Sequence, residues 1–184
     1  MSQAYAELHR PQFHFTAKTN WLNDPNGLVY CDGIWHLFFQ HNPNAPIWGD
    51  MTWGHAVSRD LLHWEQLEHA LHPDAMGAMF SGSAVVDHAD TAGFGAGTLL
   101  AFYTAAGSAV KPARPFTQCL AYSRDKGEHW TKFIENPVVD WIEGDNRDPK
   151  VIWHSVSQQW IMALYLADDR YALLVSENAR EWQK

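Results

Sequence analysis

The segment Ser123-Arg-Asp-Lys-Gly-Glu-His-Trp130 decides the fold, because two variants of it recur along the chain. They are Ser58-Arg-Asp-Leu-Leu-His-Trp64 and Ser176-Glu-Asn-Ala-Arg-Glu-Trp182. The copies lie about 50 to 65 residues apart, a spacing that is typical of proteins built from repeated structural units. The segments that precede and follow each copy are therefore expected to be equivalent to one another.

Apolar runs of strand length precede each copy, and a short run follows it. The expected first strands are 27–30, 83–86 and 150–153; the second are 35–40, 98–104 and 160–165; the third are 53–57, 118–122 and 171–175; the short fourth are 66–67, 132–133 and 183–184. Four short strands per unit, separated by Gly, Asp and Asn turns, are typical of propeller blades. The sequence predicts an all-β protein with four-stranded blades at about 20–70, 80–138 and 147–184.

The three Ser…Trp segments are expected to be scaffold rather than chemistry. Residues 123–130 resemble the Asp-box turn of several propeller families, in which Asp and Gly shape a hairpin and Trp packs between blades. Propellers have about four to eight blades, so we expect residues 1–184 to form part of a larger propeller, with no second domain. An open stack leaves apolar blade faces uncovered, and we expect self-association through them.

Composition excludes several classes of partner. The 184 residues include 13 basic and 21 acidic side chains, a net charge of −8, which argues against nucleic acid or an anionic membrane as partner. Two cysteines, Cys31 and Cys119, make neither a disulfide framework nor a zinc site. We expect no metal and no cofactor. The first residues lack the pattern of a signal peptide, so a cytoplasmic location is expected, with secretion of a longer precursor left open.

Polar residues just before the first strands are the expected site, because the innermost strands of a propeller begin at one mouth of its channel. These residues are Asn20-Trp-Leu-Asn-Asp-Pro-Asn-Gly27, Phe80-Ser-Gly-Ser83 and Asp145-Asn-Arg-Asp-Pro-Lys150. Asp24 and Asp148 fall at equivalent positions, and each precedes a proline that should hold it extended. Arg147 should keep Asp148 ionised. Turn chemistry alone explains Pro25 to Gly27 but not both Asp-Pro pairs, and paired carboxylates suit glycoside hydrolysis.

Five motifs together resemble glycoside hydrolase family 32, the invertases, levanases and inulinases. They are Trp21-Leu-Asn-Asp-Pro-Asn-Gly27, Phe38-Phe-Gln40, Trp53-Gly-His-Ala56, Phe80-Ser-Gly-Ser83 and Arg147-Asp-Pro149, in the family's order. The resemblance implies a five-bladed propeller of which this chain is the N-terminal part, without the remaining blades and the family's C-terminal β-sandwich. It also implies a retaining enzyme that cleaves terminal β-fructofuranosyl bonds of sucrose, levan or inulin.

The same resemblance assigns roles to individual residues. Asp24 is implied as the nucleophile and Asp148 as the transition-state stabiliser. The residues implied to bind fructose are Asn23, Gln40, Trp48, Phe80, Ser81 and Arg147. The family's acid/base glutamate lies in a Glu-Cys motif that this sequence does not contain, so we expect residues 1–184 to be an incomplete enzyme.

Other functions remain open at this stage. A fructan- or fructose-binding protein without catalysis is the main alternative, and an arabinanase- or xylosidase-type relative is another. The turn Asp87…Thr91-Ala-Gly-Phe94 resembles levanase- and inulinase-type members and favours a fructan β-fructosidase. The motifs Asn-Asp-Pro-Asn-Gly and Phe-Ser-Gly-Ser favour family 32 over the arabinanase or xylosidase type.

Overall fold

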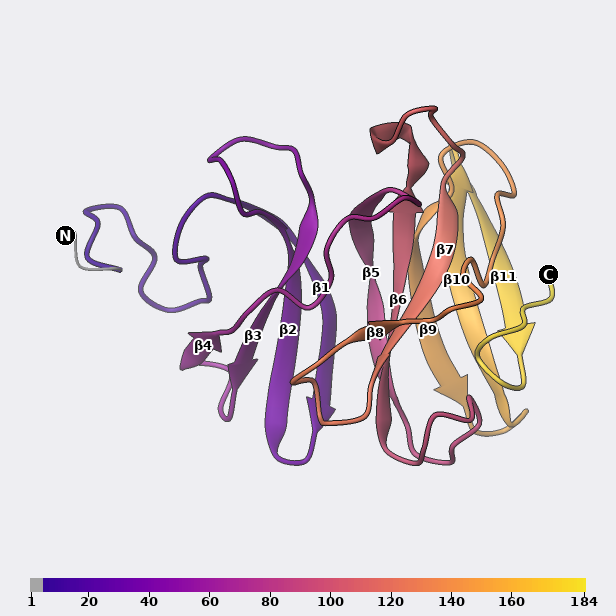
Figure 1. Cartoon of the computed structure of the whole chain (residues 1–184). Helices are drawn as coiled ribbons and strands as arrows, with labels where there is room; N and C mark the ends of the chain where they lie inside the picture. Colours follow the sequence, from indigo (N-terminus) through magenta and orange to yellow (C-terminus); the bar gives the residue numbers. More distant parts are fainter. Residues whose placement is uncertain (1–4) are drawn as a thin grey trace.

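A computed structural model describes residues 5–184, and its regular structure is three antiparallel sheets (Figure 1). The first sheet contains β1 (Trp21–Cys31), β2 (Ile34–Asn42), β3 (Thr52–Ser58) and β4 (Trp64–Gln66). The second contains β5 (Ala78–Asp87), β6 (Thr98–Ala106), β7 (Thr117–Ser123) and β8 (Thr131–Lys132). The third contains β9 (Arg147–His154), β10 (Gln159–Ala167) and β11 (Arg170–Ser176). A single 3₁₀ turn, η1 (Gly107–Ala109), precedes β7, and residues 5–184 include no α-helix.

The sheets stack in chain order, as Figure 1 shows, with β1 beside β5 and β5 beside β9. The middle sheet is covered on both faces, so every residue of β6 is buried, and its sequence is correspondingly apolar on both sides. One core fills the space between the first and second sheets around Phe38, Trp53 and Leu99. Another fills the space between the second and third sheets around Phe102, Trp160 and Met162. The prediction of a partial propeller is confirmed.

The tryptophans of the second and third repeats pack on the unit before them, as the repeat pattern predicts. Trp130 of the second unit meets Phe38 of the first edge-to-face, with ring centroids 5.2 Å apart. Trp182 meets Phe102 of the second unit in the same way, at 5.7 Å. Trp64 belongs to the first unit, and its partner is Phe15 of the N-terminal segment, at 6.0 Å. Phe15 thus covers Trp64 as the preceding unit covers Trp130 and Trp182.

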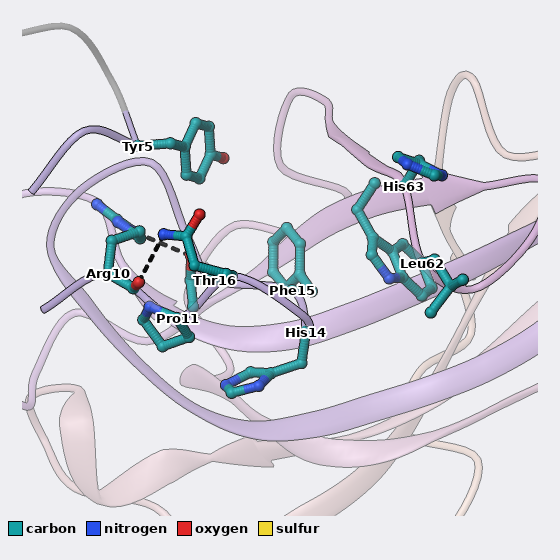
Figure 2. A pocket seen from close by; sticks show the side chains of 10 residues that line it. Tyr5, Arg10, Pro11, His14, Phe15, Thr16, Leu62 and His63 are labelled. Carbon is teal, nitrogen blue, oxygen red and sulfur yellow. Dashed lines mark hydrogen bonds between the residues drawn. The ribbon is translucent and has the colours of Figure 1, made fainter.

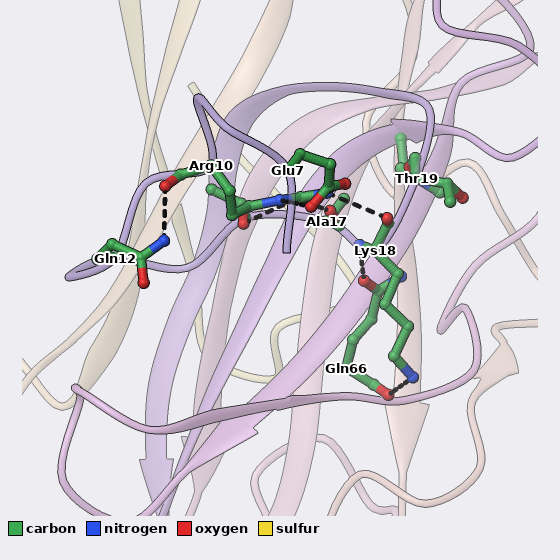
Figure 3. Close-up of polar contacts among 9 residues, drawn as sticks. Glu7, Arg10, Gln12, Ala17, Lys18, Thr19 and Gln66 are labelled. Carbon is green, nitrogen blue, oxygen red and sulfur yellow. Dashed lines mark hydrogen bonds and ion pairs between the residues drawn. The ribbon is translucent and has the colours of Figure 1, made fainter. Parts of the chain in front are cut away.

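Hydrogen bonds hold the N-terminal segment together and join its end to the first sheet. Figure 3 shows the Arg10 guanidinium donating to the carbonyls of Ala17, at 2.6 Å, and Lys18. The backbone N–H of Lys18 donates to Oε1 of Gln66 at 2.8 Å, which ties the segment to β4. A cleft remains between the segment and the 61–64 hairpin, where Figure 2 shows Phe15 and Leu62 on opposite sides.

The third sheet differs from the prediction at its last strand. Residues 183–184 were expected to form a fourth strand, but only an isolated bridge joins Gln183 to Val175. The sheet's outer face carries exposed apolar side chains, of which Tyr171 is 67% and Leu173 66% exposed. An uncovered apolar face was predicted; self-association through it stays a prediction. Within residues 5–184, no helix is long and apolar enough to cross a membrane.

Candidate active site

The three inner strands share an irregularity near one end. The pairing of β1 with β2 shifts register between Asn23 and Pro25, so Asp24 lies in a bulge. The pairing of β5 with β6 shifts between Phe80 and Gly82, which places Ser81 in a bulge. The pairing of β9 with β10 shifts beyond Arg147, at Asp148 and Pro149. Bulges redirect side chains and are over-represented next to active sites.

All eight sequence-predicted site residues lie around one cavity of about 130 Å³. The lining comes from β1, β2, β5, β9 and the loop after β2, and it consists of Asn23, Asp24, Gln40, Trp48, Phe80, Ser81, Arg147 and Asp148. The residues lie up to 125 positions apart in the chain (148 − 23), so the stacking of three sheets creates the site. One expectation is corrected: Asp24, Ser81 and Asp148 lie inside β1, β5 and β9 rather than before them.

The Asp24 carboxylate is held by a residue of the neighbouring sheet. The Ser81 hydroxyl donates to Oδ2 of Asp24 at 2.9 Å. Asp24 is exposed to the cavity mouth, so one oxygen is fixed while the side chain remains accessible. A carboxylate that is oriented and accessible can act as a nucleophile or a base.

Asp148 is held differently, through its backbone. Its N–H donates to Oγ1 of Thr104 at 3.0 Å, and Thr104 donates in turn to Oε1 of Gln118 at 2.6 Å. The backbone of Asp148 has φ +62°, in the left-handed region that aspartate tolerates better than most residues. The proline after it was expected to hold it extended, and that expectation is wrong.

Withdrawal from solvent raises the pKa of Asp148, although half of its side-chain surface stays accessible. Arg147, whose Nε lies 3.6 Å from Oδ2 of Asp148, opposes this rise, and the negative charge of Asp24 adds to it. The sequence predicted only the effect of Arg147. That effect has the expected sign, but the loss of hydration outweighs it.

Two amide side chains face the carboxylates from β1 and β2. Asn23 and Gln40 are cross-strand partners, and the Trp21 indole N–H donates to Oδ1 of Asn23 at 2.7 Å. Gln40 is 3% exposed, and its Nε2 has no protein partner. A buried amide donor without a partner is costly, so a donor that lines a cavity is a marker of ligand binding.

Aromatic rings form the rim. Trp48 is 59% exposed and meets Phe80 edge-to-face, with centroids 6.1 Å apart. Phe80 meets Phe116 at 5.5 Å. On the far side, the Arg147 guanidinium lies 4.6 Å from the centre of the Tyr165 ring. Apolar rings beside amide and carboxylate groups suit a neutral polyhydroxylated ligand.

Sequence reasoning missed Thr104, Gln118 and Trp21, which orient the site without lining it. The available signal was a polar residue within an apolar strand, because both Thr104 and Gln118 are fully buried.

Among the described residues, one group could hold a metal: Asp125, Glu128 and His129, on an outer turn where Asp125 and His129 already bond each other. Asp87, in the turn that the sequence singled out, accepts bonds from Thr91 and Ala92 and shapes that turn.

Comparison with known proteins gives consistent matches. The model of the glycosyl hydrolases family 32 N-terminal domain matches residues 14–184. The levanase of Bacillus subtilis is 48% identical over 98% of this chain and 26% of its own length. The crystal structure of an exo-inulinase from Aspergillus awamori has a TM-score of 0.89 at 38% identity, covering 97% of this chain and 40% of that one. A fructofuranosidase from Schwanniomyces occidentalis, complexed with fructose, has a TM-score of 0.88 at 40% identity, covering 100% and 37%. The chain thus spans less than half the length of these relatives.

Proposed function

The chain belongs to family 32 of the glycosyl hydrolases, and we propose that it contributes the nucleophile and fructose pocket of a retaining β-fructofuranosidase. The observation that carries the proposal is the single cavity in which Asp24, Asp148 and Gln40 meet. The proposed substrates are sucrose, levan and inulin. The similarity to a levanase and an exo-inulinase supports fructans in particular.

In the proposed reaction, the carboxylate of Asp24 attacks the anomeric carbon of the terminal fructosyl unit. The bond from that carbon to the leaving oxygen breaks, and a covalent fructosyl-enzyme forms. Water then cleaves the ester to Asp24, and fructose is released with retention. The hydrogen bond from Ser81 orients the attacking group, because it fixes one carboxylate oxygen and leaves the other accessible.

The remaining lining residues suit binding rather than bond making. In the proposal, Asp148 accepts hydrogen bonds from fructose hydroxyls and Arg147 donates hydrogen bonds to them. The negative charge of Asp148 also stabilises the positive charge that develops on the sugar ring in the transition state. The free Nε2 of Gln40 donates to a hydroxyl. Trp48 and Phe80 form the apolar wall on which the sugar rests.

The general acid is proposed to come from outside residues 5–184. Asp24 and Asp148 are the carboxylates that line the cavity within that range. Each has a role that requires the ionised form. A third carboxyl group is therefore needed to protonate the leaving oxygen, a step that contributes about 10² to 10⁴-fold in rate.

A second candidate is a fructan-binding protein without catalysis. The exposed Trp48 and the unpaired Gln40 donor favour binding whether or not a third carboxyl group is present. The two candidates differ in whether bound sugar is cleaved, which one experiment decides.

The test compares Asp24→Asn with wild type in the complete protein, by measuring fructose released from sucrose and levan. The hydrolase predicts a loss of at least about 10⁴-fold for Asp24→Asn, with sugar binding retained. The matched control is Asp169→Asn, the same change at an exposed turn, and it should leave release unchanged. Binding without fructose release by the wild type would favour the second candidate.

A further inference from the structure

Two histidines outside the cavity form a chain of hydrogen bonds, here called the relay, that runs from His69 through His41 to Thr19, just before the strand that carries Asp24. His41 follows Gln40 in β2 and is 4% exposed. Its Nδ1 lies 2.8 Å from Nε2 of His69, which is half-buried in the segment after β4. Its Nε2 lies 3.0 Å from the backbone carbonyl of Thr19. Neither histidine lines the cavity, and neither has a place in the proposed reaction.

When both rings are neutral, the chemistry of the two contacts fixes where the protons are. A carbonyl oxygen only accepts hydrogen bonds, so Nε2 of His41 must carry a proton. A neutral imidazole has one protonated nitrogen, which leaves Nδ1 of His41 as an acceptor. His69 must then donate from its own Nε2. The direction of the relay is therefore from His69 to His41 to Thr19.

The relay ends where β1 begins. Thr19 is two residues before Trp21, and two more bonds tie this entry to the segment after β2. Nδ2 of Asn20 donates to the carbonyl of Pro43 at 2.6 Å, and the N–H of Trp21 donates to the carbonyl of Ala45 at 3.2 Å. Asn20 itself has φ +69°, so these contacts hold a strained turn in place.

The position of Trp21 matters because its indole N–H donates to Oδ1 of Asn23. That bond occupies the amide oxygen of Asn23 and fixes the orientation of the amide. Nδ2 of Asn23 is then left free to donate to a ligand in the cavity that Asn23 lines. A shift of the β1 entry moves the indole, and the Asn23 amide loses its fixed orientation. Asp24, which lies in the bulge, is the next residue along the chain after Asn23.

We propose that His69 and His41 are positioning residues: as a neutral pair they hold the entry of β1, and through Trp21 they orient the Asn23 amide toward substrate. The sugar part of this inference rests on the proposed function. The relay itself does not, because the proton positions and the Asn23 orientation are properties of the free protein.

A second histidine pair supplies the matched control. Nδ1 of His36 lies 3.0 Å from Nε2 of His55, and both side chains are buried. His36 is also in β2, but it faces the turn of the second sheet, where it lies against Gly127. Breaking this pair perturbs the same strand by the same chemistry, away from the cavity.

The experiment is nuclear magnetic resonance on the complete protein, labelled with ¹⁵N in histidine and asparagine. The relay predicts that His41 carries its proton on Nε2 alone. In His69→Leu the side-chain amide signals of Asn23 should shift, and in His69→Gln, whose Nε2 also donates, they should return toward wild type. His55→Leu should lower stability but leave those signals unchanged. Fructose affinity should fall about three- to tenfold in His69→Leu, the effect of one lost hydrogen bond.

A His41 proton on Nδ1 would overturn the relay, even if His69→Leu fails to fold. Unchanged Asn23 signals in a folded His69→Leu would overturn it as well. If wild type shows the expected proton position and Asn23 response but binds no fructose, the positioning role stands and the proposed function fails.

Discussion

The Ser81 hydroxyl donates a 2.9 Å hydrogen bond to Oδ2 of Asp24, so a residue of the second sheet orients the carboxylate of the first. Both residues lie in bulges of inner strands. Neither sheet alone could form this contact. The site therefore depends on how the sheets stack, and each of the following predictions tests one part of that dependence.

Ser81→Ala removes the bond to Asp24. A hydrogen bond to a charged group contributes about 1.5 to 3 kcal/mol when it is well formed, and Asp24 is exposed, so the lower end applies. We expect kcat of the complete protein to fall about tenfold. Ser81 is only half-buried, so the urea midpoint should stay close to wild type. An unchanged kcat would mean that Ser81 does not orient the nucleophile.

Ser83→Ala is the complementary change, two residues along the same strand. The Ser83 hydroxyl is 3% exposed, donates to the carbonyl of Pro149 at 2.8 Å and accepts from the N–H of Val151 at 2.9 Å. Its loss leaves two buried backbone groups of β9 unpaired, which costs about 1 to 3 kcal/mol of unfolding free energy. Urea denaturation measures this loss. Stability equal to wild type would show that β5 and β9 are not joined through Ser83.

Asp148→Asn should stabilise the protein at neutral pH while it lowers activity. Loss of hydration raises the pKa of Asp148 in the folded state, so the ionised form costs stability at pH values above that pKa. The cost disappears as pH falls below the ordinary carboxyl pKa, because Asp148 is then neutral when folded and when unfolded. Asparagine also tolerates the left-handed backbone.

Thermal unfolding of wild type and Asp148→Asn across pH 3 to 8 measures the difference. The gain in Tm should be largest at neutral pH and should shrink toward acid. A variant that is less stable than wild type at pH 7 would show that Arg147 outweighs the loss of hydration.

The pair His36–His55 should make the protein sensitive to acid. Burial, with a smaller contribution from the neighbouring His36, lowers the pKa of His55 to about 3. The unfolded chain takes up a proton near pH 6.5 that the folded chain refuses, so stability present above pH 6.5 is lost as pH falls below it. The slope contributed by one such histidine is at most about 1.4 kcal/mol per pH unit.

Replacement of His55 by Gln should flatten that slope between pH 6.5 and 4, measured as urea-unfolding free energy. Since Gln does not titrate, any slope that remains comes from other groups. An identical slope in wild type and His55→Gln would contradict a buried neutral pair.

Most of the strands and the pairing of Asp24 with Asp148 could be predicted from local patterns in the sequence, whereas the other lining residues were assigned only by resemblance to family 32. Apolar runs of strand length located the strands, and Asp-Pro motifs on separate units located Asp24 and Asp148. The bulges could not be predicted, since a register shift is decided by the partner strand. The φ of Asp148 was mispredicted because the bond from its N–H to Thr104 joins residues 44 positions apart. The pKa of Asp148 likewise could not be predicted, because its burial and its distance from Asp24 depend on how the sheets stack.

The most direct test of the account is to trap the covalent intermediate. The complete protein is mixed with sucrose, quenched with acid, digested and analysed by mass spectrometry. The account predicts a fructosyl group attached to the peptide that contains Asp24, at the Asp24 carboxylate, and none in Asp24→Asn. A fructosyl group on another residue, or full fructose release by Asp24→Asn, would contradict it.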